Sequence, residues 1–207
     1  WLSVSPASGS NNASIIVTTT SANTGTTPRT AIVTIAGAGV ANKTVTVTQA
    51  GSTSLKTLGN TDVYGSTSTT ANRRAQIITF PEAGTIQSIS IYHNGGAGQV
   101  LLGVYADAAG VPGTRLGLTS ATTINSSAGW QTASLSSPLT VTSGQKVWLS
   151  WVFENNPGIR YISGTPARAQ SAALWSGGMP DPFGVASLAN YKYSVYCTYT
   201  VATITTK

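Results

Sequence analysis

The chain has 207 residues, a net charge of +6 at pH 7 and only 8% charged residues, about a third of the usual share. Its 41% hydrophobic content excludes a disordered chain. Its lysines and arginines are dispersed, which argues against the clustered basic surface of a nucleic-acid-binding protein. Serine, threonine, asparagine and glycine fill the polar positions, as is typical of extracellular β-proteins that meet neutral polar partners.

The sequence contains no run of 18 apolar residues, so no transmembrane helix is expected. Its single cysteine, Cys197, excludes a disulfide within the chain, and its alternating surroundings predict a buried position in a strand. Because the chain opens on Trp1 without a methionine, we expect a fragment, and the lack of a signal peptide then says nothing about secretion.

Residues 1–51 alternate between β-rich segments and turn clusters, with no helical periodicity. The strands expected here are 1–5, 14–20, 30–36 and 43–49. Three or four strands make a marginal domain by themselves.

Four motifs follow one another in this part, namely Trp1-Leu2-Ser3-Val4-Ser5-Pro6-Ala7-Ser8-Gly9, Ala22-Asn23-Thr24-Gly25, Arg29 and Val45-Thr46-Val47-Thr48-Gln49-Ala50-Gly51. Together they resemble the second half of a BACON domain, an immunoglobulin-like module often attached to bacterial glycan-degrading enzymes. The family normally has strands before the tryptophan, so the resemblance implies a truncated domain over residues 1–51. The family name implies carbohydrate binding. However, Trp1 is the only aromatic residue in this part, and we therefore expect a spacer or platform.

After a short linker from Gly51 to Ser54, the composition changes and aromatic residues become frequent. The strands expected here are 74–80, 84–93, 100–106, 119–124, 130–135, 146–153 and 191–200. Around eight short strands with Gly, Pro and Asn turns predict an antiparallel β-sandwich, most simply a jelly roll. The expected fold is therefore all-β, a partial immunoglobulin-like domain followed by a jelly roll over residues 52–207.

The strand expected over 146–153 is apolar on both faces. One face carries Val147, Leu149, Trp151 and Phe153. The opposite face carries Trp148, Ser150 and Val152. A strand of this kind belongs in the middle of a sheet in a two-layer sandwich. Trp130 begins another expected strand, and we expect it in the core.

Four further segments carry a second resemblance: 84–92, 103–113, 129–132 and 143–149. They are similar to accessory β-sandwich modules of secreted bacterial proteins, many of which adjoin glycoside hydrolases. The resemblance implies a noncatalytic carbohydrate-binding module that binds a polysaccharide or oligosaccharide. It also implies a catalytic domain in the parent protein and a secreted or cell-surface location.

From Glu154 to about Asn190 the alternation stops, which predicts a long loop, and loops of this length are usually functional. Sugars present C–H faces to aromatic rings and hydroxyls to planar polar groups. The candidate ligand-binding residues are Trp175, Tyr161, Phe183 and Tyr191 for stacking, with Arg160, Arg168, Asn155 and Asn156 for the hydroxyls. Trp175 is the strongest single candidate, because Gly177 and Gly178 follow it and leave room around its ring. The alternative is that it anchors the loop beneath Met179 and Phe183.

Two other groups remain open between a site and ordinary structure. Tyr191, Tyr193 and Tyr199 share one strand face, which would suit either a glycan platform or a half-buried sheet surface. Arg73-Arg74, with Tyr64, would suit either an acidic-sugar site or a solvated edge strand.

Catalysis has little support in the sequence. Glycoside hydrolysis needs two carboxylates, and of the five acids only Glu154 and Asp181 share the expected loop. One histidine and one cysteine exclude a zinc cluster, whereas a structural calcium ion on Asp and backbone oxygens would fit a jelly roll. A structural or adhesive module without a sugar site is the alternative, with the long loop packed on residues 1–51.

Overall fold

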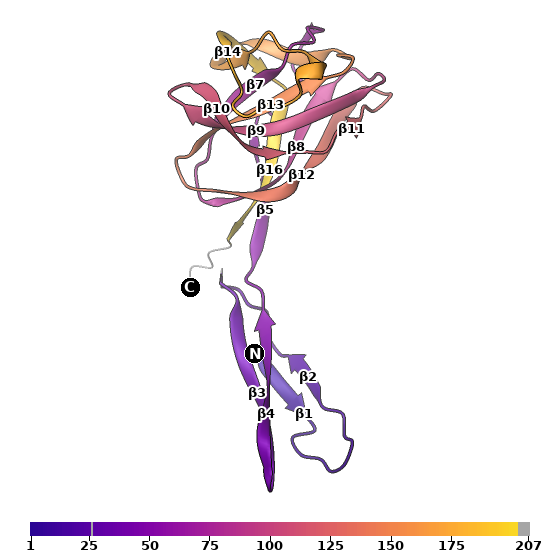
Figure 1. Cartoon of the computed structure of the whole chain (residues 1–207), viewed down its shortest axis with the longest axis vertical. Helices are drawn as coiled ribbons and strands as arrows, with labels where there is room; N and C mark the ends of the chain where they lie inside the picture. Colours follow the sequence, from indigo (N-terminus) through magenta and orange to yellow (C-terminus); the bar gives the residue numbers. More distant parts are fainter. Residues whose placement is uncertain (26, 203–207) are drawn as a thin grey trace. The chain divides into compact units, whose positions relative to one another are not determined.

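The computed structural model describes residues 1–25 and 27–202, and these form an all-β protein (Figure 1). This confirms the expected fold class. The chain divides into two compact units, Trp1–Ser54 and Leu55–Val201. The one helix of the described residues, η1 (Trp175–Gly177), is a single 3-10 turn, far too short to cross a membrane.

The first unit consists of two antiparallel hairpin-like pairs. β1 (Leu2–Ser5) pairs with β2 (Ile16–Thr19), and β3 (Arg29–Gly37) pairs with β4 (Val40–Gln49). Among the described residues of this unit, Val33 is the one hydrophobic side chain that is buried, while Ile32 is 67% exposed. The hydrophobic core of this unit is therefore small.

Arg29 joins the sequence motifs of the first unit into one network. Its guanidinium lies 4.8 Å from the centroid of the Trp1 ring, and its Nε donates a hydrogen bond to Gln49 Oε1 at 2.9 Å. Its Nη2 donates to the Ser21 carbonyl at 2.8 Å, which also accepts from Gln49 Nε2. Asn23 Nδ2 donates to the Gln49 carbonyl at 3.3 Å. The motif residues therefore fasten the loop after β2 to the paired ends of β3 and β4.

The second unit contains the remaining strands of Figure 1. They are β5 (Thr53–Gly59), β6 (Ser66–Ser68), β7 (Arg74–Thr79), β8 (Gly84–His93), β9 (Gln99–Ala108), β10 (Val111–Leu118), β11 (Thr122–Thr123), β12 (Gly129–Val141), β13 (Lys146–Phe153), β14 (Ile159–Gln170), β15 (Ser187–Tyr193) and β16 (Val195–Ala202). The hydrogen-bonded order is β10-β9-β13-β7-β14-β8-β16-β5, with β12 on β8, β15 and β6 on β14, and β11 on β9.

This sheet forms two layers that share a core, as in a β-sandwich. The layers are linked between β14 and β8 by one residue pair, Ile159 with His93. One layer contains β10, β9, β13 and β7, and the other contains β12, β8, β16 and β5. Buried side chains of both layers belong to one hydrophobic cluster, and the rings of Phe80 and Tyr199 meet at 5.1 Å. The interior of the sandwich is thus apolar and shared.

β13 is buried on both faces, as its sequence predicted. It lies between β9 and β7. Leu149 and Trp151 belong to the core between the layers, and Trp148 and Val152 belong to a second cluster on the outer face. Trp148 also donates from its indole Nε1 to Asp107 Oδ1 at 2.8 Å.

The expectation of a structureless segment over residues 154–190 is wrong, because β14 lies within it and β15 begins within it. Gly164 has a φ of +143°, and the pairing of β14 with β15 shifts register between Ser163 and Arg168. This irregularity hides the strand alternation in the sequence.

The solvated edge strand proposed for Arg73-Arg74 is also wrong. β7 lies between β13 and β14, and both arginines are at most 4% exposed. The last expected strand is two strands, β15 and β16, with Ser194 between them.

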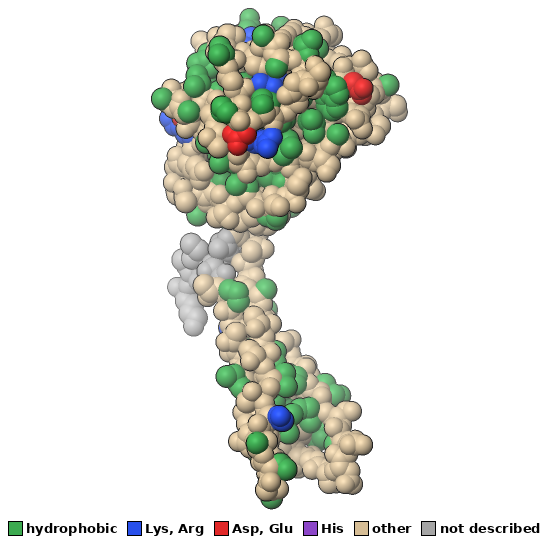
Figure 2. Space-filling model, in the orientation of Figure 1, with side chains coloured by type: hydrophobic (Ala, Val, Ile, Leu, Met, Phe, Trp, Pro, Cys, Tyr) green, Lys and Arg blue, Asp and Glu red, His purple; other side chains and the backbone are tan. Residues whose placement is uncertain are grey.

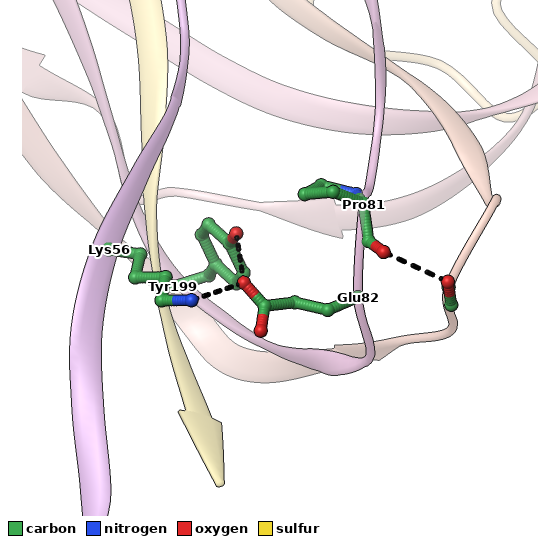
Figure 3. A network of polar contacts seen from close by, with 5 residues as sticks. Lys56, Pro81, Glu82 and Tyr199 are labelled. Carbon is green, nitrogen blue, oxygen red and sulfur yellow. Dashed lines mark hydrogen bonds and ion pairs between the residues drawn. The ribbon is translucent and has the colours of Figure 1, made fainter. Parts of the chain in front are cut away.

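Glu82 ties three parts of the second unit together (Figure 3). Its Oε1 forms an ion pair with Lys56 Nζ at 2.5 Å and accepts a hydrogen bond from the Tyr199 hydroxyl at 3.4 Å. The neighbouring Pro81 carbonyl accepts from Ser143 Oγ at 3.0 Å. These contacts connect β5, the turn before β8, and β16.

The buried weak acids of the second unit predict a loss of stability in alkali. Burial raises the pKa of Cys197 and of Tyr105 to about 12, from 9.0 and 10.0. Above pH 9 the unfolded chain therefore loses protons that the folded chain retains. The free energy of unfolding should fall with rising pH, by up to about 1.4 kcal/mol per pH unit for each group.

Urea unfolding followed by tryptophan fluorescence from pH 8 to pH 11 measures this dependence. Between pH 9 and 10 the thiol dominates, so Cys197→Ala should flatten that part of the curve. An identical slope in the variant would contradict the assignment to Cys197.

Candidate functional site

Residues 171–186, which we call the strap, cover the outer face of the layer that contains β9, β13 and β7. Met179 and Phe183 are buried there in a cluster with Tyr105, Trp148 and other side chains of these strands. The rings of Phe183 and Tyr105 meet edge to face at 5.0 Å. The strap therefore serves as a third layer over an apolar sheet face.

Two arginines and a tyrosine fasten the strap. Arg73 Nη1 donates to the Gly178 carbonyl at 3.0 Å, and its Nη2 donates to the Phe183 carbonyl at 2.5 Å. Arg115 Nη1 donates to the Met179 carbonyl, and the Tyr105 hydroxyl donates to the Pro180 carbonyl at 2.9 Å. Backbone carbonyls, rather than acidic side chains, thus satisfy these donors.

The strap buries one of the two predicted stacking residues that it carries and leaves the other partly exposed. Phe183 is fully buried, and the Arg73 guanidinium lies 4.6 Å from its ring centroid, so this ring is not open to a ligand. Trp175 is half-buried and packs against the same cluster as Phe183. Only part of its ring therefore faces solvent.

Three other predicted residues come together on β14 and β15. The ring centroids of Tyr161 and Tyr191 are 5.4 Å apart with perpendicular planes. The Arg168 guanidinium lies 5.9 Å from the Tyr191 centroid. Tyr193, from the same strand as Tyr191, stacks on Tyr161 with centroids 5.4 Å apart. We call this group, with Arg74, the tyrosine–arginine cluster.

The remaining predicted residues lie elsewhere. Arg160 is adjacent to Tyr161 in the strand, so it points to the opposite face, where Nη1 donates to the Gly65 carbonyl at 3.3 Å. Asn156 is occupied in a turn, since its Nδ2 donates to the Thr70 carbonyl at 2.6 Å and its Oδ1 accepts from the Gly158 amide. Asn155 is exposed before this turn.

Arg74 also belongs to the tyrosine–arginine cluster, although the sequence offered it, with Arg73 and Tyr64, only as an alternative acidic-sugar site and not among the principal ligand-binding residues. Its Nη1 donates to the Tyr193 hydroxyl at 2.5 Å and to Ser68 Oγ at 2.7 Å, and its Nε donates to Gln170 Oε1 at 2.9 Å. Burial lowers its pKa, and the charge of Arg168 lowers it further. The feature of the sequence that indicated this role is the adjacent pair Arg73-Arg74 at the start of an apolar strand.

The outer face of the other layer carries a second aromatic group, formed by Trp130, Tyr92 and Tyr196. The centroids of Trp130 and Tyr92 are 5.6 Å apart, and those of Trp130 and Tyr196 are 4.8 Å apart. All three are half-buried, and none belongs to the two hydrophobic clusters of the described residues. The expected core position of Trp130 is wrong, because Gln131, Ala133 and Leu135 point inward instead.

Hydroxyl groups adjoin these rings. Thr132 and Ser134 follow Trp130 on the same face of β12, and both are exposed. Thr132 Oγ1 and Ser90 Oγ share a hydrogen bond of 2.7 Å. We call this surface the hydroxyl–aromatic face: Tyr92, Ser90, Trp130, Thr132, Ser134, Tyr196 and Thr198. Unlike the face beneath the strap, it is polar at its edges and uncharged.

Two of the acids have partners within the fold. Asp181 accepts from the Arg115 amide at 2.9 Å, and Asp107 accepts from the Trp148 indole. Among the described residues there is no group of three or more His, Cys, Asp and Glu side chains that could hold a metal ion. His93 is buried, with Nε2 2.8 Å from Gln131 Oε1, and burial lowers its pKa. His93 therefore serves the fold.

Comparison with known proteins gives one family match. Residues 1–50 match the BACON family, which is described as "Putative binding domain, N-terminal". No curated protein matches the chain. A solved structure described as that of infectious bursal disease virus, Gx strain, aligns with 95% of this chain and 38% of that chain at 10% identity. Its TM-score of 0.28 is too low to support an inference about fold or function. The family match lies entirely within the first unit and does not extend into the second unit.

The strap predicts a sharp contrast between two of its own side chains. Phe183→Ala should lower the free energy of unfolding by about 3 kcal/mol, because it empties a buried site beneath Arg73. Val185→Ala is the matched control, since Val185 is 95% exposed in the same segment and should change stability by less than about 0.5 kcal/mol. Urea unfolding of the two variants measures the contrast. Equal stability would show that the strap does not support the sheet.

Proposed function

We propose that this chain is a noncatalytic glycan-binding module and that its hydroxyl–aromatic face holds a neutral polysaccharide or oligosaccharide. The observation that carries the proposal is the difference between the two outer faces of the sandwich. The strap covers one face with Met179 and Phe183. The other face keeps Trp130, Tyr92 and Tyr196 partly open beside a row of hydroxyls.

The chemistry of this face suits a sugar better than an apolar partner. Ring planes inclined by 85° between Tyr92 and Trp130, and by 60° between Trp130 and Tyr196, do not form one flat surface. One ring would stack against the C–H face of a single sugar unit while the others line its edge. Thr132, Ser134 and Thr198 would then bond its hydroxyls.

Composition supports a neutral ligand. Only 8% of the residues are charged, and Figure 2 shows few charged side chains on the face of the molecule in view. The contact would be weak for a single sugar unit. Attachment to a catalytic domain in a secreted or cell-surface bacterial protein would raise the effective concentration at the polysaccharide. The match of residues 1–50 to a family of binding domains supports a binding role in general.

A structural or adhesive module without a sugar site is the second candidate. It is favoured by the strap, whose aromatic side chains stabilise the sheet beneath them. In the first unit, the Arg29 guanidinium likewise donates its hydrogen bonds to Gln49 and Ser21 of the same chain, which is a structural role. Under this alternative no glycan is retained.

The test is retention of the chain by insoluble polysaccharides and by a glycan array, with and without EDTA. Trp130→Ala should weaken binding by about tenfold or more, the usual effect of removing a central aromatic contact. Trp175→Ala is the control from the strap side and should bind as the unmodified chain does. The EDTA arm reports any calcium requirement.

Thermal unfolding of Trp130→Ala shows whether the variant is folded. Trp130→Phe keeps an aromatic ring at this position and should therefore retain part of the binding. If Trp130→Ala folds and binds normally while Trp175→Ala loses binding, the site lies on the strap. If no polysaccharide retains the chain, the proposal fails in favour of the structural or adhesive module.

A further inference from the structure

We propose that the tyrosine–arginine cluster is a second binding site, separate from the hydroxyl–aromatic face, and that it takes the carboxylate of an acidic sugar such as a hexuronate. The assignment of an anion site rests on Arg74 and Arg168 and their surroundings. The choice of a sugar as the carrier of the anion rests on the proposed function.

The strand register brings the two arginines together. Gln76 is the pairing partner of Arg168, and Arg74 is the partner of Gln170. Side chains two residues apart share a face, so all four belong to one face of the β7–β14 pair. Arg74 and Arg168 are diagonal neighbours there, with Cα atoms about 7–8 Å apart. That spacing would let one small anion reach both guanidinium groups.

Both guanidinium groups retain donors that the chain does not satisfy. Arg168 Nε is buried without a hydrogen-bond partner in the described chain, as are Arg73 Nε and Arg160 Nε, but Arg168 alone of these shares a face with Arg74. The one hydrogen bond of its side chain is long, 3.4 Å from Nη1 to the Ser187 carbonyl. Arg74 is 4% exposed, and only its Nε and Nη1 donate hydrogen bonds to described residues. A carboxylate with two oxygens would match these free donors.

No acid neutralises the pair. Among the described residues the one ion pair is Lys56–Glu82. Gln76 and Gln170, the side chains paired across from the arginines, are uncharged. Two buried or half-buried cations without an anion are unfavourable, since each has lost water and they repel each other. The mutual repulsion contributes to the lowered pKa of Arg74. An anion between them would relieve both effects.

The tyrosines favour a sugar as the carrier of the carboxylate. Tyr161 and Tyr191 are half-buried, and they meet at right angles beside Arg168. This leaves aromatic edges and faces next to the cations, where C–H groups of a sugar ring could pack. Arg73, one residue before Arg74, points to the opposite face of the sheet, where its Nη1 and Nη2 donate to strap carbonyls. Its Nε is buried without a partner in the described chain, but on that other face, so Arg73 does not belong to this site.

Isothermal titration of the whole chain with trigalacturonate tests the proposal, with the methyl-esterified trimer as the uncharged probe. The acid should bind, the ester should bind at least tenfold more weakly, and affinity for the acid should fall with added salt. Arg168→Gln should weaken binding of the acid about tenfold or more. Arg168→Lys keeps the positive charge but lacks the paired donors of the guanidinium, and it should therefore retain part of the affinity for the acid.

Arg160→Gln is the matched control, because Arg160 lies on the same strand but faces the other way. It should bind as the unmodified chain does. Thermal unfolding of each variant shows that it is folded. Arg168 is chosen over Arg74 because Arg74 holds Tyr193, Ser68 and Gln170 in place.

Trp130→Ala separates this proposal from the preceding one. It should lose neutral glycan but keep the hexuronate, whereas Arg168→Gln should do the reverse. Equal affinity for acid and ester, or no binding of the acid, would overturn the anion site. Binding of a glutamate-rich peptide as tight as that of the hexuronate would overturn the choice of a sugar.

Discussion

Strand β13 has large apolar side chains on both faces, and both faces must be shielded from water. β9 and β7 flank it within its layer, and the second layer covers Leu149 and Trp151. The opposite face, with Trp148 and Val152, needs a further cover, and the strap supplies it through Met179 and Phe183. The segment that carries Trp175 and Phe183, two of the predicted binding residues, thus covers an apolar face of the sheet.

This requirement moves the candidate sites away from the strap. A loop held by Arg73, Arg115 and Tyr105 through its own carbonyls has a fixed conformation, and its ring at Phe183 is fully buried. The open outer face lies on the other layer, where β12, β8 and β16 carry no comparable apolar row. Residues there alternate between the core and small hydroxyls, with Trp130, Tyr92 and Tyr196 at one end. The fold therefore leaves this outer face uncovered by any described segment comparable to the strap.

The sequence predicted the parts of the fold that regular alternation specifies. The period-two pattern of 146–153 gave the central strand and both of its faces correctly. The same reasoning failed for residues 159–170, because an irregular pairing around Gly164 removes the alternation although a strand forms. It failed for Trp130 by one residue of register, since Gln131 points inward instead and forms a hydrogen bond with His93. Neither feature has a signal in a single sequence, because register depends on the neighbouring strands.

Charge supplies the last constraint. Eleven Lys and Arg residues share the chain with five acids, so most cations must find partners other than carboxylates. Arg29 uses Gln49, a Ser21 carbonyl and the Trp1 ring, and Arg73 uses two strap carbonyls. Both are fastenings, and the family motif around Arg29 is explained by folding alone. Arg168 differs, since it is half-buried, lies beside another arginine on the same face of the sheet and donates one side-chain hydrogen bond to the described chain, at 3.4 Å. Its Nε is buried without a partner in the described chain, as are those of Arg73 and Arg160. The position of Arg168 beside Arg74 and the Tyr191 ring, with no described acid paired to either arginine, is better explained by an anionic ligand than by packing alone.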